Sequence, residues 1–261
     1  MSRYRATALV LGAAIGLGAA PAPAQQDTIT NVVLVHGAWA DGSGWREIYD
    51  ILTAQGFAVS IVQNPLTSLA DDVAATDRVL DRQSGPAVLV GHSYGGAVIT
   101  EAGDHDNVAA LVYVEAFVPD AGETVFGLIP QQEGVAPPFE VSEDGFVFFS
   151  ADAFVPGFAD SVDPALANFM RDSQVPISFE AAGNATLSVA AWHEKPSWYQ
   201  LADADHVIPP EIQRQMAERA GSTLVEIGGG HLAFMADPQA TADLIVAAAG
   251  GTAQKQIRGG R

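Results

Sequence analysis

The motif Gly-x-Ser-x-Gly, with Ser93 at its centre, is the feature of the sequence that most directly indicates chemistry. A buried β-branched run at 87–90 precedes it and a helical stretch at 95–102 follows it, which is the strand–turn–helix setting that the motif requires. In this setting Gly91 and Gly95 let the strand and the helix approach closely, because they carry no side chains. The spacing therefore predicts a serine nucleophile on a tight turn, whereas the motif without this setting often arises by chance in Gly-rich chains.

A serine nucleophile needs a base whose pKa lies near neutrality, and an imidazole meets that need. The chain has six histidines, of which His231 follows a predicted strand at 223–227 and three glycines and precedes the last predicted helix. His92 lies inside the motif, where we expect its side chain to point away from Ser93. Its place after a strand and just before the last helix makes His231 the candidate base, and the alternative is a histidine on a surface loop.

The base in turn needs a carboxylate that orients the imidazole and stabilises its protonated form. Asp203 and Asp205 both stand in the loop after a predicted strand at 198–202, and Glu115 ends another predicted strand. By position alone, all three are candidates for the acid.

Around these residues, short β-branched runs alternate with helical stretches, which is typical of an α/β fold with a mostly parallel, doubly wound sheet covered by helices on both faces. The predicted strands are residues 32–35, 58–62, 87–90, 108–114, 198–202 and 223–227. The predicted helices are residues 45–55, 70–83, 95–102, 210–220 and 238–249. The pattern indicates one catalytic domain at 27–249.

The alternation stops between about residues 118 and 192, where the chain is rich in Pro, Gly, Phe and Asp. A segment of this length predicts an inserted cap subdomain rather than a single loop. Six of its phenylalanines could line an apolar substrate pocket, although the default explanation is that they form the core of the cap itself. They are Phe139, Phe146, Phe148, Phe149, Phe154 and Phe158. Residues 250–261 are Gly-rich and basic, and we expect a flexible tail there.

Residues 1–24 have the three parts of a secretory signal peptide, with Arg3 and Arg5 before an apolar stretch at 6–20 and a small-residue site that ends at Ala24. The sequence therefore predicts cleavage after Ala24 and export to the periplasm or the medium. The alternative is an N-terminal membrane anchor, but glycines interrupt the stretch and it is short for a bilayer span.

The chain is strongly acidic, with a formal net charge of −19 that becomes −21 once Arg3 and Arg5 leave with the signal peptide. Nucleic acid and anionic membranes would repel such a surface, so we expect a small-molecule substrate and neither of those partners after cleavage. The chain has no cysteine, which excludes disulfides and thiolate ligands. The expected chemistry needs no cofactor and no metal. The sequence does not determine the oligomeric state.

Three segments together resemble the α/β-hydrolase superfamily: the turn at 33–39 with its His-Gly-Ala sequence, the motif around Ser93, and the pair Gly230-His231. Within that superfamily, they are most similar to the branch of small serine esterases and hydroxynitrile lyases. The resemblance covers nearly all of the mature chain outside the cap.

The resemblance implies roles for several further residues. It aligns Asp205 with the catalytic acid and makes Asp203 a loop-capping residue. It also implies that the backbone N–H groups of Ala38 and Tyr94 form the oxyanion hole, and that His36 braces the turn rather than taking part in the chemistry.

The implied function is hydrolysis of a small or medium uncharged carboxylic ester or lactone through an acyl-enzyme on Ser93. The alternatives that use the same triad are a lyase and a hydrolase of amide, carbamate or C–C bonds. A non-catalytic binding protein of the same fold is a further alternative, because a fold does not fix a function. Covalent labelling of Ser93 by a fluorophosphonate would distinguish an enzyme from such a protein.

Overall fold

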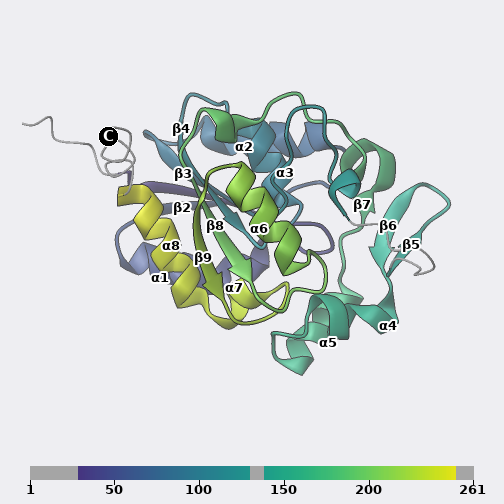
Figure 1. Cartoon of the computed structure of the whole chain (residues 1–261). Coiled ribbons are helices and arrows are strands. Elements are labelled where there is room, and N and C mark those ends of the chain that lie inside the picture. The colour runs from purple at the N-terminus through teal and green to yellow at the C-terminus, as the bar shows by residue number, and fades with distance from the viewer. Residues whose placement is uncertain (1–28, 130–137, 251–261) are drawn as a thin grey trace, which may run out of the picture.

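A computed structural model describes residues 29–129 and 138–250, and its centre is a six-stranded sheet in the order β2-β1-β3-β4-β8-β9 (Figure 1). The strands are β1 (Asn31–Val35), β2 (Ala58–Val62), β3 (Ala87–His92), β4 (Val108–Val114), β8 (Ser197–Ala202) and β9 (Thr223–Ile227). All neighbouring pairs in this sheet are parallel. The predicted α/β class with a mostly parallel sheet is confirmed.

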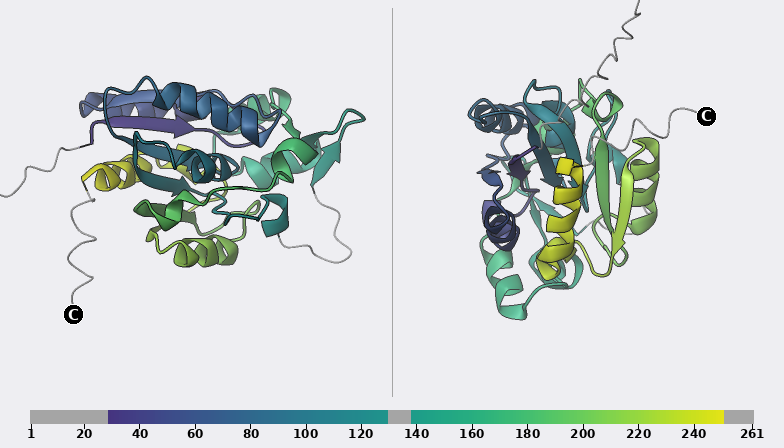
Figure 2. Two further views of the ribbon diagram at one scale, coloured as in Figure 1. Left: turned by 90° about the horizontal axis from the view of Figure 1, so that it is seen from above. Right: turned by 90° about the vertical axis from the view of Figure 1, so that its left-hand side faces the viewer.

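Helices cover both faces of the sheet. They are α1 (Arg46–Ala54), α2 (Leu69–Leu80), α3 (Gly95–Ala102), α6 (Pro210–Arg219), α7 (Ala233–Ala236) and α8 (Pro238–Gly250). Helix α1 packs on α8 on one face, and α2 packs on α3 on the other (Figure 2). This arrangement follows from right-handed crossovers, because the chain first moves from β1 outward to β2 and then in the opposite direction through β3 and β4.

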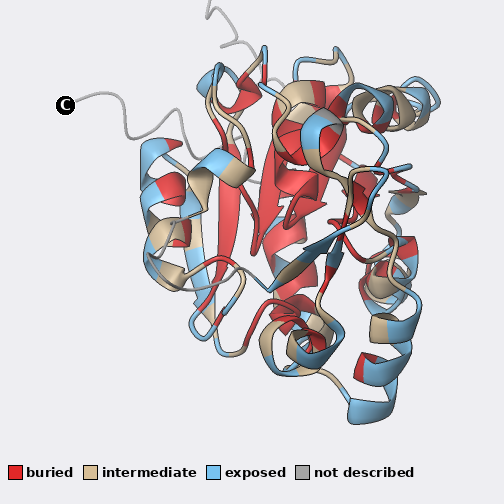
Figure 3. Cartoon of the chain, turned by 90° about the vertical axis from the view of Figure 1, so that its right-hand side faces the viewer, coloured by how far each residue is buried: buried red, intermediate tan, exposed pale blue. Residues whose placement is uncertain are grey.

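The burial of the strands follows their place in the sheet. Strands β1 and β3 are buried at every residue, whereas the edge strands β2 and β9 are largely part-exposed or exposed. Figure 3 shows the buried residues gathered in the strands at the centre of the fold. Central strands that are covered on both faces become continuous apolar runs, and this is why the sequence located them closely. Strand β3 extends two residues beyond the prediction, to His92, and α2 ends at Leu80 rather than at residue 83.

The loops after β1 and β3 leave the sheet where the direction of the chain reverses. Strands β1 and β3 are neighbours, but β1 leads into α1 on one face and β3 leads into α3 on the other, which leaves space at the carboxyl ends of these two strands. His36 follows β1, and Ser93 follows β3. The fold therefore brings the His-Gly-Ala turn beside the serine motif.

The described residues between β4 and β8 include a second, three-stranded antiparallel sheet in the order β5-β6-β7, together with the α-helices α4 and α5 and short 3-10 and π-helical turns. The strands and α-helices are β5 (Phe139–Val141), β6 (Phe146–Phe149), α4 (Ala151–Ala153), α5 (Pro164–Asp172) and β7 (Ile177–Ser178). Rings of this segment pack around Trp39 of the core, with centroids 5.2 Å away for Phe149 and 5.9 Å for Phe158. The boundaries of a cap subdomain stay a prediction.

The predicted signal peptide at 1–24 lies outside the described residues, as does the predicted tail at 250–261 apart from Gly250, which ends α8. Among the helices of the described ranges, none has both the length and the apolar character that crossing a membrane requires.

Candidate active site

Ser93 stands at a strained turn between β3 and α3. Its φ angle is +54°, in the left-handed region that residues other than glycine rarely adopt. A Cβ atom on Gly91 would lie 2.5 Å from the carbonyl oxygen of Gly95, and one on Gly95 would lie 2.7 Å from that of Val35. Neither backbone oxygen could move away cheaply. The glycine spacing in the motif is therefore what the packing of this turn requires.

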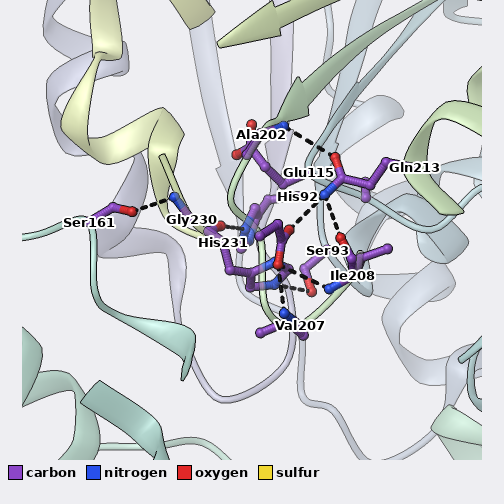
Figure 4. Close-up of polar contacts among 12 residues, drawn as sticks. His92, Ser93, Glu115, Ser161, Ala202, Val207, Ile208, Gln213, Gly230 and His231 are labelled. Carbon is purple, nitrogen blue, oxygen red and sulfur yellow. Dashed lines mark hydrogen bonds and ion pairs between the residues drawn. The ribbon is translucent and has the colours of Figure 1, made fainter. Parts of the chain in front are cut away.

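Ser93, His231 and Asp205 form a continuous hydrogen-bonded chain, of which Figure 4 labels Ser93 and His231. Oγ of Ser93 lies 2.8 Å from Nε2 of His231, and Nδ1 of His231 lies 2.8 Å from Oδ2 of Asp205. Because a carboxylate only accepts hydrogen bonds, Nδ1 carries the ring proton and Nε2 accepts from the serine hydroxyl. The side chains of His231 and Asp205 are completely buried. This arrangement suits the transfer of a proton from Ser93 to the imidazole.

The carboxylate of Asp205 is held by donors at both of its oxygens. Oδ1 accepts from the backbone N–H groups of Val207, at 2.7 Å, and Ile208, at 3.0 Å. Oδ2 accepts from Nε2 of Gln213, at 2.8 Å, as well as from His231. Gln213 was not predicted from the sequence, although one signal was available: it is a polar residue three and four positions before Met216 and Ala217, on the same face of α6.

The other two candidate acids have different partners. Asp203 accepts from the backbone N–H of Gly229 at 3.0 Å, which stabilises the glycine loop before the base. Glu115 is completely buried at the end of β4, and its Oε1 accepts from Nε2 of Gln200 at 3.0 Å. Burial raises the pKa of the Glu115 carboxyl well above its ordinary value. The geometry therefore places Asp205, of these three, against His231.

The turn after β1 lies directly against the nucleophile. A Cβ atom on Gly37 would come within 2.7 Å of the Cβ of Ser93. The next amide, of Ala38, and the amide of Tyr94 have no hydrogen-bond acceptor within residues 29–129 and 138–250, whereas the amide of Trp39 donates to a backbone carbonyl at 3.1 Å. Two free N–H groups beside Ser93 are able to bind a developing oxyanion.

Two buried histidines support the site without contacting the serine hydroxyl. Nε2 of His36 accepts from the backbone N–H of Asn64 at 2.9 Å, and its Nδ1–H donates to the carbonyl of Gly37 at 2.8 Å. Nε2–H of His92 donates to the carbonyl of His231 at 2.9 Å. Burial lowers the pKa of both rings, that of His92 well below its ordinary value, so both are neutral. The supporting role of His92 was not foreseen.

A buried carboxylate also anchors the turn that carries the nucleophile. The hydroxyl of Tyr94 donates to Oδ2 of Asp72 at 2.7 Å, and the backbone N–H of Leu66 donates to Oδ1 at 2.8 Å. Burial raises the pKa of Asp72 to about 6. Because Asp72 belongs to α2, this bond ties the motif to a neighbouring helix.

The inserted segment reaches the loop that carries the base. The hydroxyl oxygen of Ser161 accepts from the backbone N–H of Gly230 at 2.6 Å (Figure 4). Close by, Nε2 of His206 lies 4.0 Å from Oδ2 of Asp160, which links the segment to the acid loop as well.

A cavity of about 370 Å³ lies near the site, between α1, α5 and α7. Its wall includes Trp39, Trp45, Leu166, Phe169, Leu232 and Phe234, together with polar and charged residues, and Ser93 does not line it. None of the six phenylalanines singled out in the sequence lines it either. Phe149, Phe154 and Phe158 are instead buried against one another. The described part of the chain holds no group of three or more His, Asp or Glu side chains placed to bind a metal ion.

A model of the alpha/beta hydrolase family matches residues 32–244. A carbendazim-hydrolyzing esterase of Nocardioides sp. is 31% identical over 163 residues, which is 56% of this chain and 65% of that protein. A pyrethroid hydrolase of Sphingobium wenxiniae is 27% identical over 254 residues, covering 84% of this chain and 87% of that protein. Methylesterase 8 of Arabidopsis thaliana is 26% identical over 247 residues, which cover 83% of this chain and 88% of that protein.

Solved structures have the same fold at lower identity. The crystal structure of a pyrethroid hydrolase has a TM-score of 0.71 at 22% identity and covers 87% of this chain and 100% of that chain. The crystal structure of polyneuridine aldehyde esterase also has a TM-score of 0.71, at 17% identity, and the match covers 84% of this chain and 98% of that chain.

Proposed function

Because the chain belongs to the alpha/beta hydrolase family, we propose that it hydrolyses small or medium uncharged carboxylic esters or lactones through an acyl-enzyme on Ser93. The observation that carries this proposal is the hydrogen-bonded chain from Ser93 through His231 to Asp205. Relatives along much of the chain are named as esterases or hydrolases, which supports ester hydrolysis as the reaction class.

In the first half of the proposed reaction, Oγ of Ser93 attacks the ester carbonyl carbon while Nε2 of His231 takes the hydroxyl proton. The carbonyl oxygen becomes an oxyanion, and the amides of Ala38 and Tyr94 donate to it. Asp205 keeps the imidazole in the required tautomer and stabilises its positive charge. The tetrahedral intermediate then collapses, the C–O bond of the ester breaks, and His231 gives its proton to the departing alcohol.

Water completes the cycle. His231 removes a proton from the water as it attacks the acyl carbon, and the resulting intermediate expels Oγ of Ser93, which recovers a proton from the imidazolium. The products are a carboxylic acid and the free enzyme. The side chains of this chain supply every proton transfer in the sequence.

The surroundings of the site support an uncharged substrate. The formal net charge of −19 disfavours the approach of anions. The nearby cavity has a wall of apolar and polar residues, and its apolar part, which includes Trp39 directly after Ala38, suits an aliphatic or aromatic substituent of the ester.

The test is to label the purified protein with a fluorophosphonate and to assay p-nitrophenyl esters of rising acyl length, with an aryl amide and an aryl carbamate beside them. We expect labelling at Ser93, ester turnover, and loss of both in Ser93→Ala. If Ser93 is labelled but the protein hydrolyses only the amide or only the carbamate, the substrate is an amide or a carbamate and not an ester. Absence of labelling in the folded protein would favour the non-catalytic alternative.

A further inference from the structure

Gln213 is a buried polar residue at a position where helix α6 otherwise presents apolar groups. The buried residues of this helix are Gln213, Met216 and Ala217, which lie on one face because they are spaced by three and four positions. The side chain of Gln213 is fully shielded from solvent. A buried amide is costly unless it is hydrogen-bonded, so its presence on this face calls for a physical reason.

The amide of Gln213 makes three hydrogen bonds, and together they fix its orientation (Figure 4). Nε2 donates to Oδ2 of Asp205 at 2.8 Å and to the carbonyl of Ile208 at 2.7 Å. Oε1 accepts from the backbone N–H of Ala202, the last residue of β8, at 3.3 Å. If the nitrogen and oxygen of the amide exchanged places, the oxygen would face Oδ2 of Asp205 and the carbonyl of Ile208, which are both acceptors. Gln213 thus joins the end of the strand, the acid loop and α6.

The bond to Asp205 falls on the oxygen that also accepts from His231. The backbone amides of Val207 and Ile208 hold the other oxygen, so Gln213 is the one side chain besides the imidazole that is hydrogen-bonded to Oδ2 within the described ranges. Without it, Oδ2 would be hydrogen-bonded to the imidazole alone, and the two backbone amides at Oδ1 would be the remaining support of the carboxylate. An amide suits this place because it donates a hydrogen bond and does not ionise.

We infer that Gln213 is a positioning residue, which holds the Asp205 carboxylate in the orientation that orients His231 toward Ser93. The inference rests on the proposed function of the same three residues. In this inference Gln213 does not contact the substrate. Replacing Gln213 should therefore slow the chemical step and leave substrate binding unchanged.

A matched control exists elsewhere in the core. Gln200 on β8 is equally buried, and its Nε2 also donates twice, to Oε1 of Glu115 at 3.0 Å and to Oγ1 of Thr241 at 2.9 Å. It has no hydrogen bond to Asp205 or His231. Gln213→Met and Gln200→Met therefore remove the same kind of amide at the same burial, and only the first removes a bond to the acid.

The test compares the kinetics of both variants and the far-downfield proton resonance of the imidazole Nδ1–H that bonds to Asp205. In Gln213→Met we expect kcat to fall by about 10- to 100-fold with KM little changed, and the resonance to shift or broaden. In Gln200→Met both should stay near the wild-type values. If the two variants lose kcat equally, or if Gln213→Met keeps both kcat and the resonance, the inference is overturned.

A second variant covers the case in which Gln213→Met does not fold. Gln213→Glu keeps the shape of the side chain. Its carboxyl can donate to Asp205 only while it is protonated, because an ionised carboxylate has no proton to donate. Once ionised, it would also place a second negative charge beside Asp205. We expect the ratio of its kcat to the wild-type kcat to fall as the pH rises, and a ratio independent of pH would contradict the inference. If the wild type hydrolyses no ester, the proposed function fails, while the resonance still decides whether Gln213 orients the acid.

Discussion

The hydroxyl of Ser93 and Nε2 of His231 lie 2.8 Å apart, although the two residues are 138 positions apart in the sequence. Both residues are buried, so water competes little for this hydrogen bond. The tight turn with its positive φ angle positions Ser93, and the hydrogen bond from His92 to the backbone carbonyl of His231 supports the base.

If Ser93 and His231 act as one unit, their losses do not add. We expect Ser93→Ala and His231→Ala each to lower kcat for an ester by about 10⁶-fold, as in a comparable triad. The double variant should lose no more than either single variant. Single-turnover kinetics on the three proteins checks this, and losses that multiply would show that the two residues act independently.

The three candidate acids should separate clearly on mutation. Asp205→Asn should lower kcat by about 10⁴-fold, because an amide favours the wrong imidazole tautomer and cannot stabilise the imidazolium. Asp203→Asn and Glu115→Gln should keep most of the activity, since neither carboxyl is bonded to His231. The comparison is made at saturating substrate over a range of pH. A large loss of kcat in Glu115→Gln with a small one in Asp205→Asn would show that Glu115, directly after β4, is the catalytic acid.

Asp72 should make the stability of the fold depend on pH. Its pKa is about 6 in the folded protein against an ordinary value of 3.8, so the folded state binds the proton more tightly than the unfolded state. The resulting stabilisation is present below about pH 4 and is lost as the pH rises through 6, by up to about 3 kcal/mol. Urea unfolding of the wild type and of Asp72→Asn between pH 4 and 8 should show this relative loss in the wild type. A constant difference between the two would refute it.

Gly95 should not tolerate a side chain. A Cβ atom there would lie 2.7 Å and 2.8 Å from the carbonyl oxygens of Val35 and His36, so Gly95→Ala must displace the turn beside the nucleophile. We expect a loss of about 2 kcal/mol or more in unfolding free energy, together with reduced activity. Gly85→Ala is the control, because its nearest neighbour would be 3.8 Å away. Similar thermal unfolding of the two variants would contradict this expectation.

We propose that residues 1–24 direct export and are then removed, on the evidence of the two arginines, the apolar stretch and the small-residue site. Expression of the full chain in a Gram-negative host should yield protein outside the cytoplasm with an N-terminus at or near Gln25. Mass spectrometry of that fraction checks the cleavage. Intact Met1 on the exported protein would favour the membrane-anchor alternative.

Much of the fold could be predicted because its signals are local. Strands β2, β4 and β9 have the bounds that the sequence predicted, since each is a short run rich in β-branched residues that turn residues precede or follow. Ser93 could be singled out for the same reason, as the strand, the glycines and the helix that define its turn are contiguous. The inserted segment was recognised only by the absence of regular alternation, and the pairing of β5, β6 and β7 could not be predicted.

The sequence by itself thus determined the fold class, the strand order along the chain and the serine at the turn, because each depends on neighbours within a few residues. Only the tertiary structure decided which of Asp203, Asp205 and Glu115 meets His231. It alone revealed the support that Gln213 gives to that acid. Both facts depend on side chains from separate elements converging within about 3 Å, where hydrogen bonds form. No local pattern encodes such distances, because they are set by how the whole sheet and its helices pack.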